Sequence, residues 1–157
     1  MVRAALLLIG GLIAASATAV ESVVLGKGVS NAYAADVACT DIRACMQSVY
    51  VWEFDATRTI TGPPVIGRVK VLATQHTDAT SKFVRSVELF VVRPIDDPAV
   101  RKTYDAEYYL VGLSPRYERS TYCLPVNPAD IGLNIPSSEI NVEPDSGYYC
   151  FARRLVR

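Results

Sequence analysis

Residues 48–74 read SVYVWEFDATRTITGPPVIGRVKVLAT and contain the two clearest strand patterns of the chain. In the first, over residues 48–59, aromatic side chains occupy every second position at Tyr50, Trp52 and Phe54. In the second, over residues 65–74, valines alternate with charged side chains. Successive side chains of a strand point to opposite faces, so both segments are predicted to be strands with one buried face. The Gly-Pro-Pro sequence at 62–64 separates them, because proline cannot continue a hydrogen-bonded ladder.

Four more strands and one short helix are predicted in the rest of the chain. Runs of β-branched and aromatic residues between turn-forming clusters indicate strands at 83–92, 106–113, 121–126 and 147–156. Residues 96–102 begin with two aspartates and a proline and end in Arg101-Lys102, which predicts one or two helical turns. Residues 128–144 are expected to be irregular, with a helical turn near 129–133.

This order of elements predicts an all-β protein. Three strands, a short helix and two or three further strands resemble the five-stranded OB barrel. We therefore expect a small five- to six-stranded OB-like barrel, with one short helix between strands 3 and 4, as a single domain over residues 48–157. A β-sandwich is the alternative. Residues 20–47 show no regular pattern and are interpreted as a loose N-terminal leader that carries two cysteines.

The first 19 residues have the layout of a secretory signal peptide. Arg3 gives a positive start, residues 4–15 are uncharged and apolar, and Ala17-Thr18-Ala19 is a small-residue cleavage site. A second A-x-A sequence at 32–34 lies far from the apolar run, and an N-terminal membrane anchor would need a longer apolar stretch. We therefore expect a periplasmic or secreted protein with no stable membrane span after cleavage.

The chain has four cysteines: Cys39, Cys45, Cys123 and Cys150. An even number of cysteines in an exported chain indicates disulfides. Zinc sites usually contain closely spaced cysteine pairs, which these spacings do not offer. We favour the pairs Cys39–Cys45 and Cys123–Cys150. The first pair requires residues 39–45 to form a loop, and the crossed pairings remain open.

Composition and motifs argue against several classes of function. The 157 residues include 16 basic and 16 acidic ones, so no field of one sign favours nucleic acid as a partner. His76 is the single histidine, and no nucleophile motif, metal-ligand spacing or phosphate-binding glycine loop is present in the sequence. No metal or cofactor is therefore expected. Whether the protein is an enzyme is left open, and Glu53 and Asp55, which share a strand face, are the carboxylates a hydrolase would use.

Tyrosine and arginine are interleaved in the last third of the chain. This composition is typical of binding surfaces, through stacking, cation–π contact and bidentate hydrogen bonds. The candidate ligand-binding residues are Tyr108, Tyr109, Arg116, Tyr117 and Arg119. The leading hypothesis is an exported, non-enzymatic binding or envelope-associated module for a protein or saccharide partner. The alternatives are a secreted inhibitor or immunity-type protein and a small carboxylate-dependent hydrolase.

Overall fold

A computed structural model describes residues 20–36, 48–75, 84–115 and 120–156. Several predictions fall outside these ranges: the signal peptide over residues 1–19, the Cys39–Cys45 pair, His76, and the candidate residues Arg116, Tyr117 and Arg119. Within the described ranges, no helix has the length and apolar character needed to cross a bilayer.

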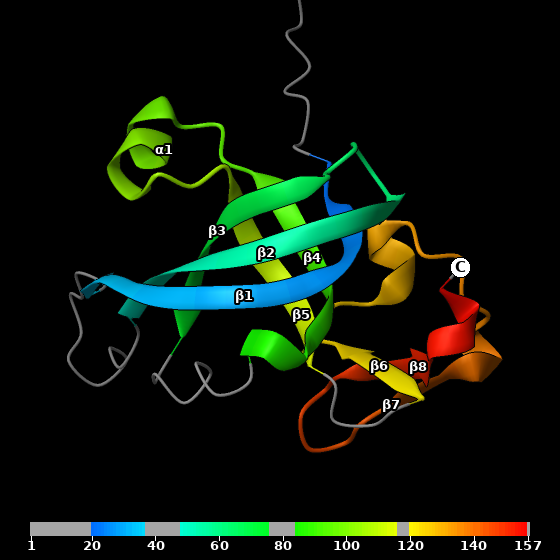
Figure 1. The fold of residues 1–157 in the computed structure, drawn as a ribbon. Helices are drawn as coiled ribbons and strands as arrows, with labels where there is room; N and C mark the ends of the chain where they lie inside the picture. Colours follow the sequence, from blue (N-terminus) through cyan, green and yellow to red (C-terminus); the bar gives the residue numbers. More distant parts are fainter. Residues whose placement is uncertain (1–19, 37–47, 76–83, 116–119, 157) are drawn as a thin grey trace, which may run out of the picture.

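Five strands close into a barrel in the order β1-β2-β3-β5-β4. They are β1 (Ser22–Asp36), β2 (Ser48–Thr61), β3 (Gly67–Gln75), β4 (Val87–Pro94) and β5 (Tyr108–Pro115). β1 pairs antiparallel with both β2 and β4, which closes the barrel, and β3 runs parallel to β5. The predicted all-β, OB-like barrel is therefore confirmed (Figure 1). A 3₁₀ helix, η2 (Val84–Ser86), leads into β4.

The short helix stands where it was predicted. α1 (Pro98–Tyr104) lies between the strands predicted third and fourth, which are β4 and β5 of the barrel. The carboxylate of Asp97 accepts a hydrogen bond from the Ala99 N–H at 2.8 Å and caps the helix. The helix ends at Asp105, which adopts the left-handed conformation at φ 50°. α1 covers a small apolar cluster on the outside of the barrel, built on Leu72, Ile95 and Ala106.

The barrel interior is aromatic and apolar. Trp52, Phe54 and Phe90 are buried, with stacked ring centroids 5.8 Å apart for Trp52 and Phe54 and 4.2 Å apart for Phe54 and Phe90. The alternation that predicted β2 is confirmed, since Tyr50, Trp52 and Phe54 all belong to this interior cluster.

The interpretation of residues 20–47 as a loose leader is wrong for residues 22–36, which form β1, while residues 37–47 lie outside the described ranges. The strand pairs with β2 along its whole length, but the pairing shifts register between Gly28 and Ser30 and again between Tyr33 and Ala35. Each shift inserts an extra residue into β1, as a β-bulge does, and such insertions break the alternation of faces. The period-two signal that revealed β2 is therefore absent from β1. The barrel begins at Ser22 rather than at Ser48.

The last third of the chain forms a second, three-stranded sheet beside the barrel (Figure 1). Its order is β6-β8-β7, with β6 (Thr121–Leu124), β7 (Ile140–Val142) and β8 (Tyr149–Ala152). The strands predicted at 121–126 and 147–156 therefore do not extend the barrel, and β7 lies in a stretch expected to be irregular. Three 3₁₀ helices accompany the sheet: η3 (Pro128–Ile131), close to the predicted turn, η4 (Ser137–Glu139) and η5 (Arg153–Leu155).

A second apolar core joins this sheet to the outside of the barrel. Val23, Leu89 and Val91 of the barrel belong to the same cluster as Leu124 and Phe151 of the sheet. β4 is therefore buried on both faces, because its alternate residues Phe90 and Val92 face the interior. An ion pair between Arg153 and Glu88 crosses the same junction, and the Arg153 guanidinium lies 4.9 Å from the ring centroid of Tyr122.

Candidate binding surfaces

The two described tyrosines of the predicted surface lie on opposite sides of the barrel wall. Tyr108 packs against the interior cluster, whereas Tyr109 packs outside, against the cluster beneath α1. The Arg93 guanidinium stands 5.9 Å from the centroid of the Tyr109 ring, and the two residues are directly paired between β4 and β5. Arg93 was not predicted as a site residue, because its contact with Tyr109 depends on the register of two strands and not on spacing along the chain.

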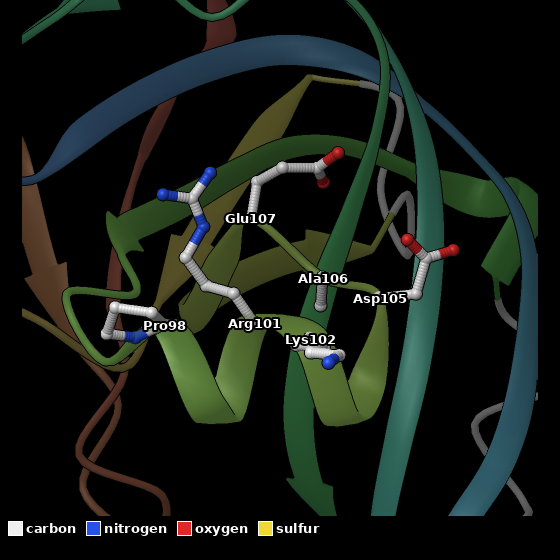
Figure 2. Close-up of a pocket in the computed structure, with 6 residues that line it drawn as sticks. All are labelled: Pro98, Arg101, Lys102, Asp105, Ala106 and Glu107. Carbon is white, nitrogen blue, oxygen red and sulfur yellow. The ribbon is translucent and has the colours of Figure 1, made fainter.

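A hollow of about 390 Å³ lies beside α1 (Figure 2). It is lined by residues of the helix and by the residues that lead into β5: Pro98, Arg101, Lys102, Asp105, Ala106 and Glu107. The left-handed turn at Asp105 stops the helix and directs the chain back to the barrel. The hollow therefore brings two cations and two carboxylates together on one exposed rim.

The two carboxylates of the hollow are already engaged by Lys70 of β3. The Lys70 ammonium forms an ion pair with Asp105, and its backbone N–H donates to Glu107 Oε2 at 2.9 Å. The hydrogen bond to Asp105, and then the Coulomb attraction of that carboxylate, raise the pKa of Lys70. Arg93, Arg101 and Lys102 form no ion pair with a carboxylate in the part of the chain that the structure describes. The backbone N–H does not neutralise Glu107, but the three unpaired cations outnumber this one carboxylate, so the excess charge of these groups is positive.

Glu53 and Asp55 lie together on an outer strand face, and a single guanidinium joins them. Arg68 bonds Asp55 through two nitrogens, with the Nη2–Oδ2 distance 3.2 Å, and its Nη1 lies 3.5 Å from Glu53 Oε2. The hydrogen bond to Asp55 is the largest cause that raises the pKa of Arg68. The Ser30 hydroxyl donates to Glu53 at 3.0 Å. Acid–base pairs in enzymes keep one carboxyl protonated by burial or by a neighbouring like charge. Here the neighbour is a cation on an exposed face, which is the arrangement of an ion-pair network.

The barrel interior contains two polar donors that make no hydrogen bond. Asn31 and Trp52 are directly opposite each other in the β1–β2 ladder. Asn31 Nδ2 and Trp52 Nε1 are both buried and have no hydrogen-bond partner among the described residues. A buried donor without an acceptor costs about 1–3 kcal/mol. Cross-strand pairing continues this row through Val71 to Tyr108, so the predicted site residue Tyr108 shares it. Towards the end of the barrel, the partly exposed ring of Tyr33 stands edge-on to Tyr50, with centroids 5.9 Å apart.

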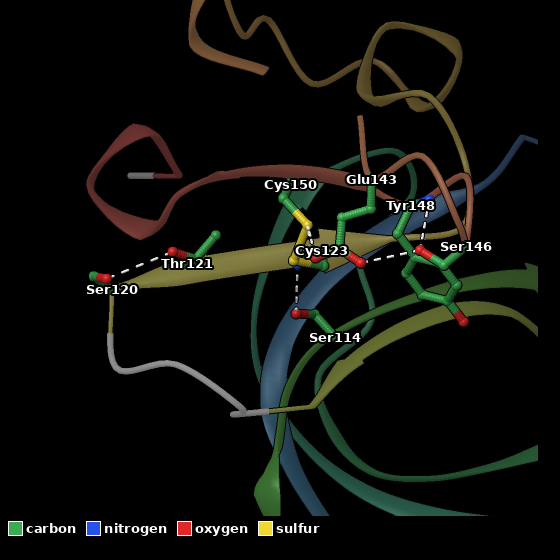
Figure 3. Close-up of a disulfide and its surroundings, with 8 residues drawn as sticks. All are labelled: Ser114, Ser120, Thr121, Cys123, Glu143, Ser146, Tyr148 and Cys150. Atoms are coloured by element: carbon green, nitrogen blue, oxygen red, sulfur yellow. Dashed lines mark hydrogen bonds between the residues drawn. A yellow bond between two sulfur atoms is a disulfide. The ribbon is translucent and has the colours of Figure 1, made fainter. Parts of the chain in front are cut away.

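The predicted disulfide between Cys123 and Cys150 is present and joins directly opposite residues of β6 and β8 (Figure 3). It is compatible with an oxidising compartment outside the cytoplasm. The Glu143 carboxylate lies 3.6 Å from Cys150 Sγ, and the ligand atoms of these three residues lie within 4.8 Å of one another. Metals are bound by thiolates, and the disulfide leaves none available. This cluster is therefore a structural staple while the bond is intact.

The geometry thus offers two places for a ligand: a cationic outer surface at α1 and a pair of unsatisfied donors inside the barrel. Comparison of the chain with known protein families, with curated proteins and with solved structures finds no match.

Proposed function

We propose that the protein is an exported, non-enzymatic binding module that holds an acidic segment of a partner protein on its α1 surface. We define the α1 surface as Arg93, Arg101, Lys102 and Tyr109. The observation that carries the proposal is the unbalanced charge of this surface. Lys70 engages both carboxylates of the hollow, while the three cations lack a carboxylate within the described ranges. A partner that brings carboxylates supplies the missing counter-charges, and arginine binds them through two parallel hydrogen bonds.

The positions of the cations support a binding role over a purely local one. Arg101 and Lys102 lie in the last turn of α1, where basic side chains also favour the negative end of the helix dipole. Arg93 lies on β4, so the helix dipole does not account for it. The Ile95 N–H donates to the Glu107 carbonyl at 3.0 Å, which aligns the end of β4 with the rim of the hollow. Arg93 therefore stands two residues, or about 7 Å along the strand, from that rim.

The location also agrees with the way barrels of this architecture are used. OB barrels bind ligands with the connections between strands 1 and 2 and between strands 4 and 5. α1 is the connection between β4 and β5. Since one fold supports many functions, this analogy supports the place of binding, and the acidic character of the partner rests on the charges alone.

A pull-down with matched charge variants tests the proposal. Mature protein is used as bait for periplasmic or extracellular extract, beside the variant Arg93→Ala/Arg101→Ala and the control Arg58→Ala/Arg85→Ala. The control removes two exposed arginines elsewhere on the barrel. We expect the wild type and the control to retain the same partner. The affinity of that partner for the α1 variant should be more than tenfold lower than for the wild type, a difference of about 1.4 kcal/mol in binding free energy. Binding should also weaken as salt is added.

Equal retention by all three proteins would show that the α1 surface does not bind the partner. Turnover of any substrate that is abolished by Glu53→Gln or Asp55→Asn would replace the binding function with an enzymatic one.

A further inference from the structure

The row of inward-facing residues at Asn31 and Trp52 points to a ligand. Trp52 is 1% exposed, and the amide nitrogen of Asn31 is buried opposite it. The side chains around them in the interior cluster are apolar or aromatic, including Phe54, Val71 and Ala73. An apolar residue in place of Asn31 would pack in this interior without leaving a donor unsatisfied. Because directly opposite side chains of a ladder lie close together, one acceptor between them can satisfy both donors.

We propose that this end of the barrel binds the neutral carbonyl oxygen of an amide group, held between Asn31 Nδ2 and Trp52 Nε1. Both donors are uncharged, and the buried side chains that the structure describes include no cation that would offset a buried carboxylate. The desolvation free energy of a charged ligand would therefore be uncompensated, whereas a neutral acceptor has a much smaller desolvation cost. The planar amide and the methyl group bonded to its carbonyl carbon can pack against the faces of the surrounding aromatic rings.

Tyr33 lies at the end of the barrel where the proposed ligand would enter. Its ring is 57% exposed, although it lies on the inward side of β1 opposite Tyr50. It stands edge-on to Tyr50 at the end of the barrel, two residues along the strand from Asn31. A ligand that enters past Tyr33 meets an exposed aromatic ring before it reaches the two donors. This site lies inside the barrel wall, whereas the α1 surface lies outside it. Either proposal can therefore be refuted without affecting the other.

Amide carbonyls of this kind occur in acetamido sugars and in acylated amino acids, and the experiment separates the two sources. Trp52 is the only tryptophan of the chain, so its fluorescence reports directly on the site. The mature protein is titrated with N-acetylglucosamine and with N-acetylalanine amide, and glucose serves as the sugar without an amide. We expect a saturable change in Trp52 emission with at least one amide and none with glucose. The compound that saturates first identifies the source.

The variant Asn31→Leu removes one donor, keeps the number and branching of the side-chain heavy atoms, and leaves the fluorophore in place. Its dissociation constant for the active amide should rise at least tenfold, while Arg85→Ala, which removes an exposed arginine outside both proposed sites, should leave it unchanged. Circular dichroism establishes that the variant is folded, and the wild-type titration stands by itself if it is not. An equal response to glucose, an unchanged affinity in Asn31→Leu, or no saturable response to either amide would overturn the proposal. The last result would mean that a single internal water satisfies the two donors.

Discussion

Replacing Trp52 with alanine tests whether the barrel is built around this ring. The side chain is 1% exposed and stacks on Phe54 at a centroid distance of 5.8 Å. Truncation of a buried tryptophan costs about 3–5 kcal/mol, through lost burial and the cavity that remains. Since domains of this kind are stable by about 5–15 kcal/mol, the loss is a large part of the total. We expect the urea midpoint of Trp52→Ala, followed by circular dichroism, to fall accordingly.

The variant Trp52→Phe separates the burial of the ring from the unsatisfied indole N–H. The smaller phenyl ring buries less apolar surface, which lowers the free energy of unfolding by about 1 kcal/mol. It also removes a buried donor without an acceptor, whose cost is about 1–3 kcal/mol. The two effects nearly cancel, so Trp52→Phe should lie within about 2 kcal/mol of the wild type and be clearly more stable than Trp52→Ala.

Ile66→Ala is the matched control, because Ile66 is a large apolar side chain that is 73% exposed. Its stability should stay within about 0.5 kcal/mol of the wild type. A loss below about 1 kcal/mol for Trp52→Ala would refute the packing described here. A Trp52→Phe variant as unstable as Trp52→Ala would show that the indole N–H is satisfied.

Three further predictions concern the staple, the ion pairs and export. Reducing the Cys123–Cys150 disulfide, which closes a 27-residue separation, should lower the free energy of unfolding by about 3 kcal/mol, seen as a lower urea midpoint in reductant. Lys70→Met should destabilise the protein at neutral pH, and the gap to the wild type should close in alkali. The pKa of Lys70 is raised in the folded state, so its charge stabilises the fold below the ordinary lysine pKa, and this stabilisation is lost as pH rises through the folded-state pKa. A stability difference between Lys70→Met and the wild type that stays constant with pH would contradict the role of the charge. Intact mass of the exported protein should correspond to a chain that begins at Val20, and a retained Met1 or a start at Ala35 would count against the predicted cleavage.

Much of the fold was predictable because the strands with one buried face show their alternation openly. Tyr50, Trp52 and Phe54 of β2 all point into the barrel, and the valines of β3 do the same. The helix was predictable from its cap, since Asp97 accepts the hydrogen bond that its position before Pro98 suggests. The second sheet was not predictable as a separate layer. Its strands have ordinary strand sequences, and their pairing with one another depends on long-range register.

The candidate sites depended on register even more. Tyr109 was identified from composition, but its partner Arg93 lies on another strand, and only the β4–β5 pairing brings them together. Tyr108 was grouped with Tyr109 because the two are adjacent in sequence. Adjacent residues of a strand face opposite ways, so one tyrosine belongs to the α1 surface and the other to the interior. A period-two reading of residues 108–109 alone would have separated them.

The irregularity that concealed β1 also places its polar residue inside the barrel. A regular strand would align Gly26 and Gly28 with Ser30 and Ala32 on one face. The register shift after Gly28 sets both Val29 and Ser30 against Glu53, so Asn31 and Tyr33 take the inward positions instead. Bulges commonly redirect side chains in this way near functional sites. In an apolar interior, an asparagine with an unsatisfied amide is costly, and a ligand that accepts its hydrogen bond gives a reason for its presence there.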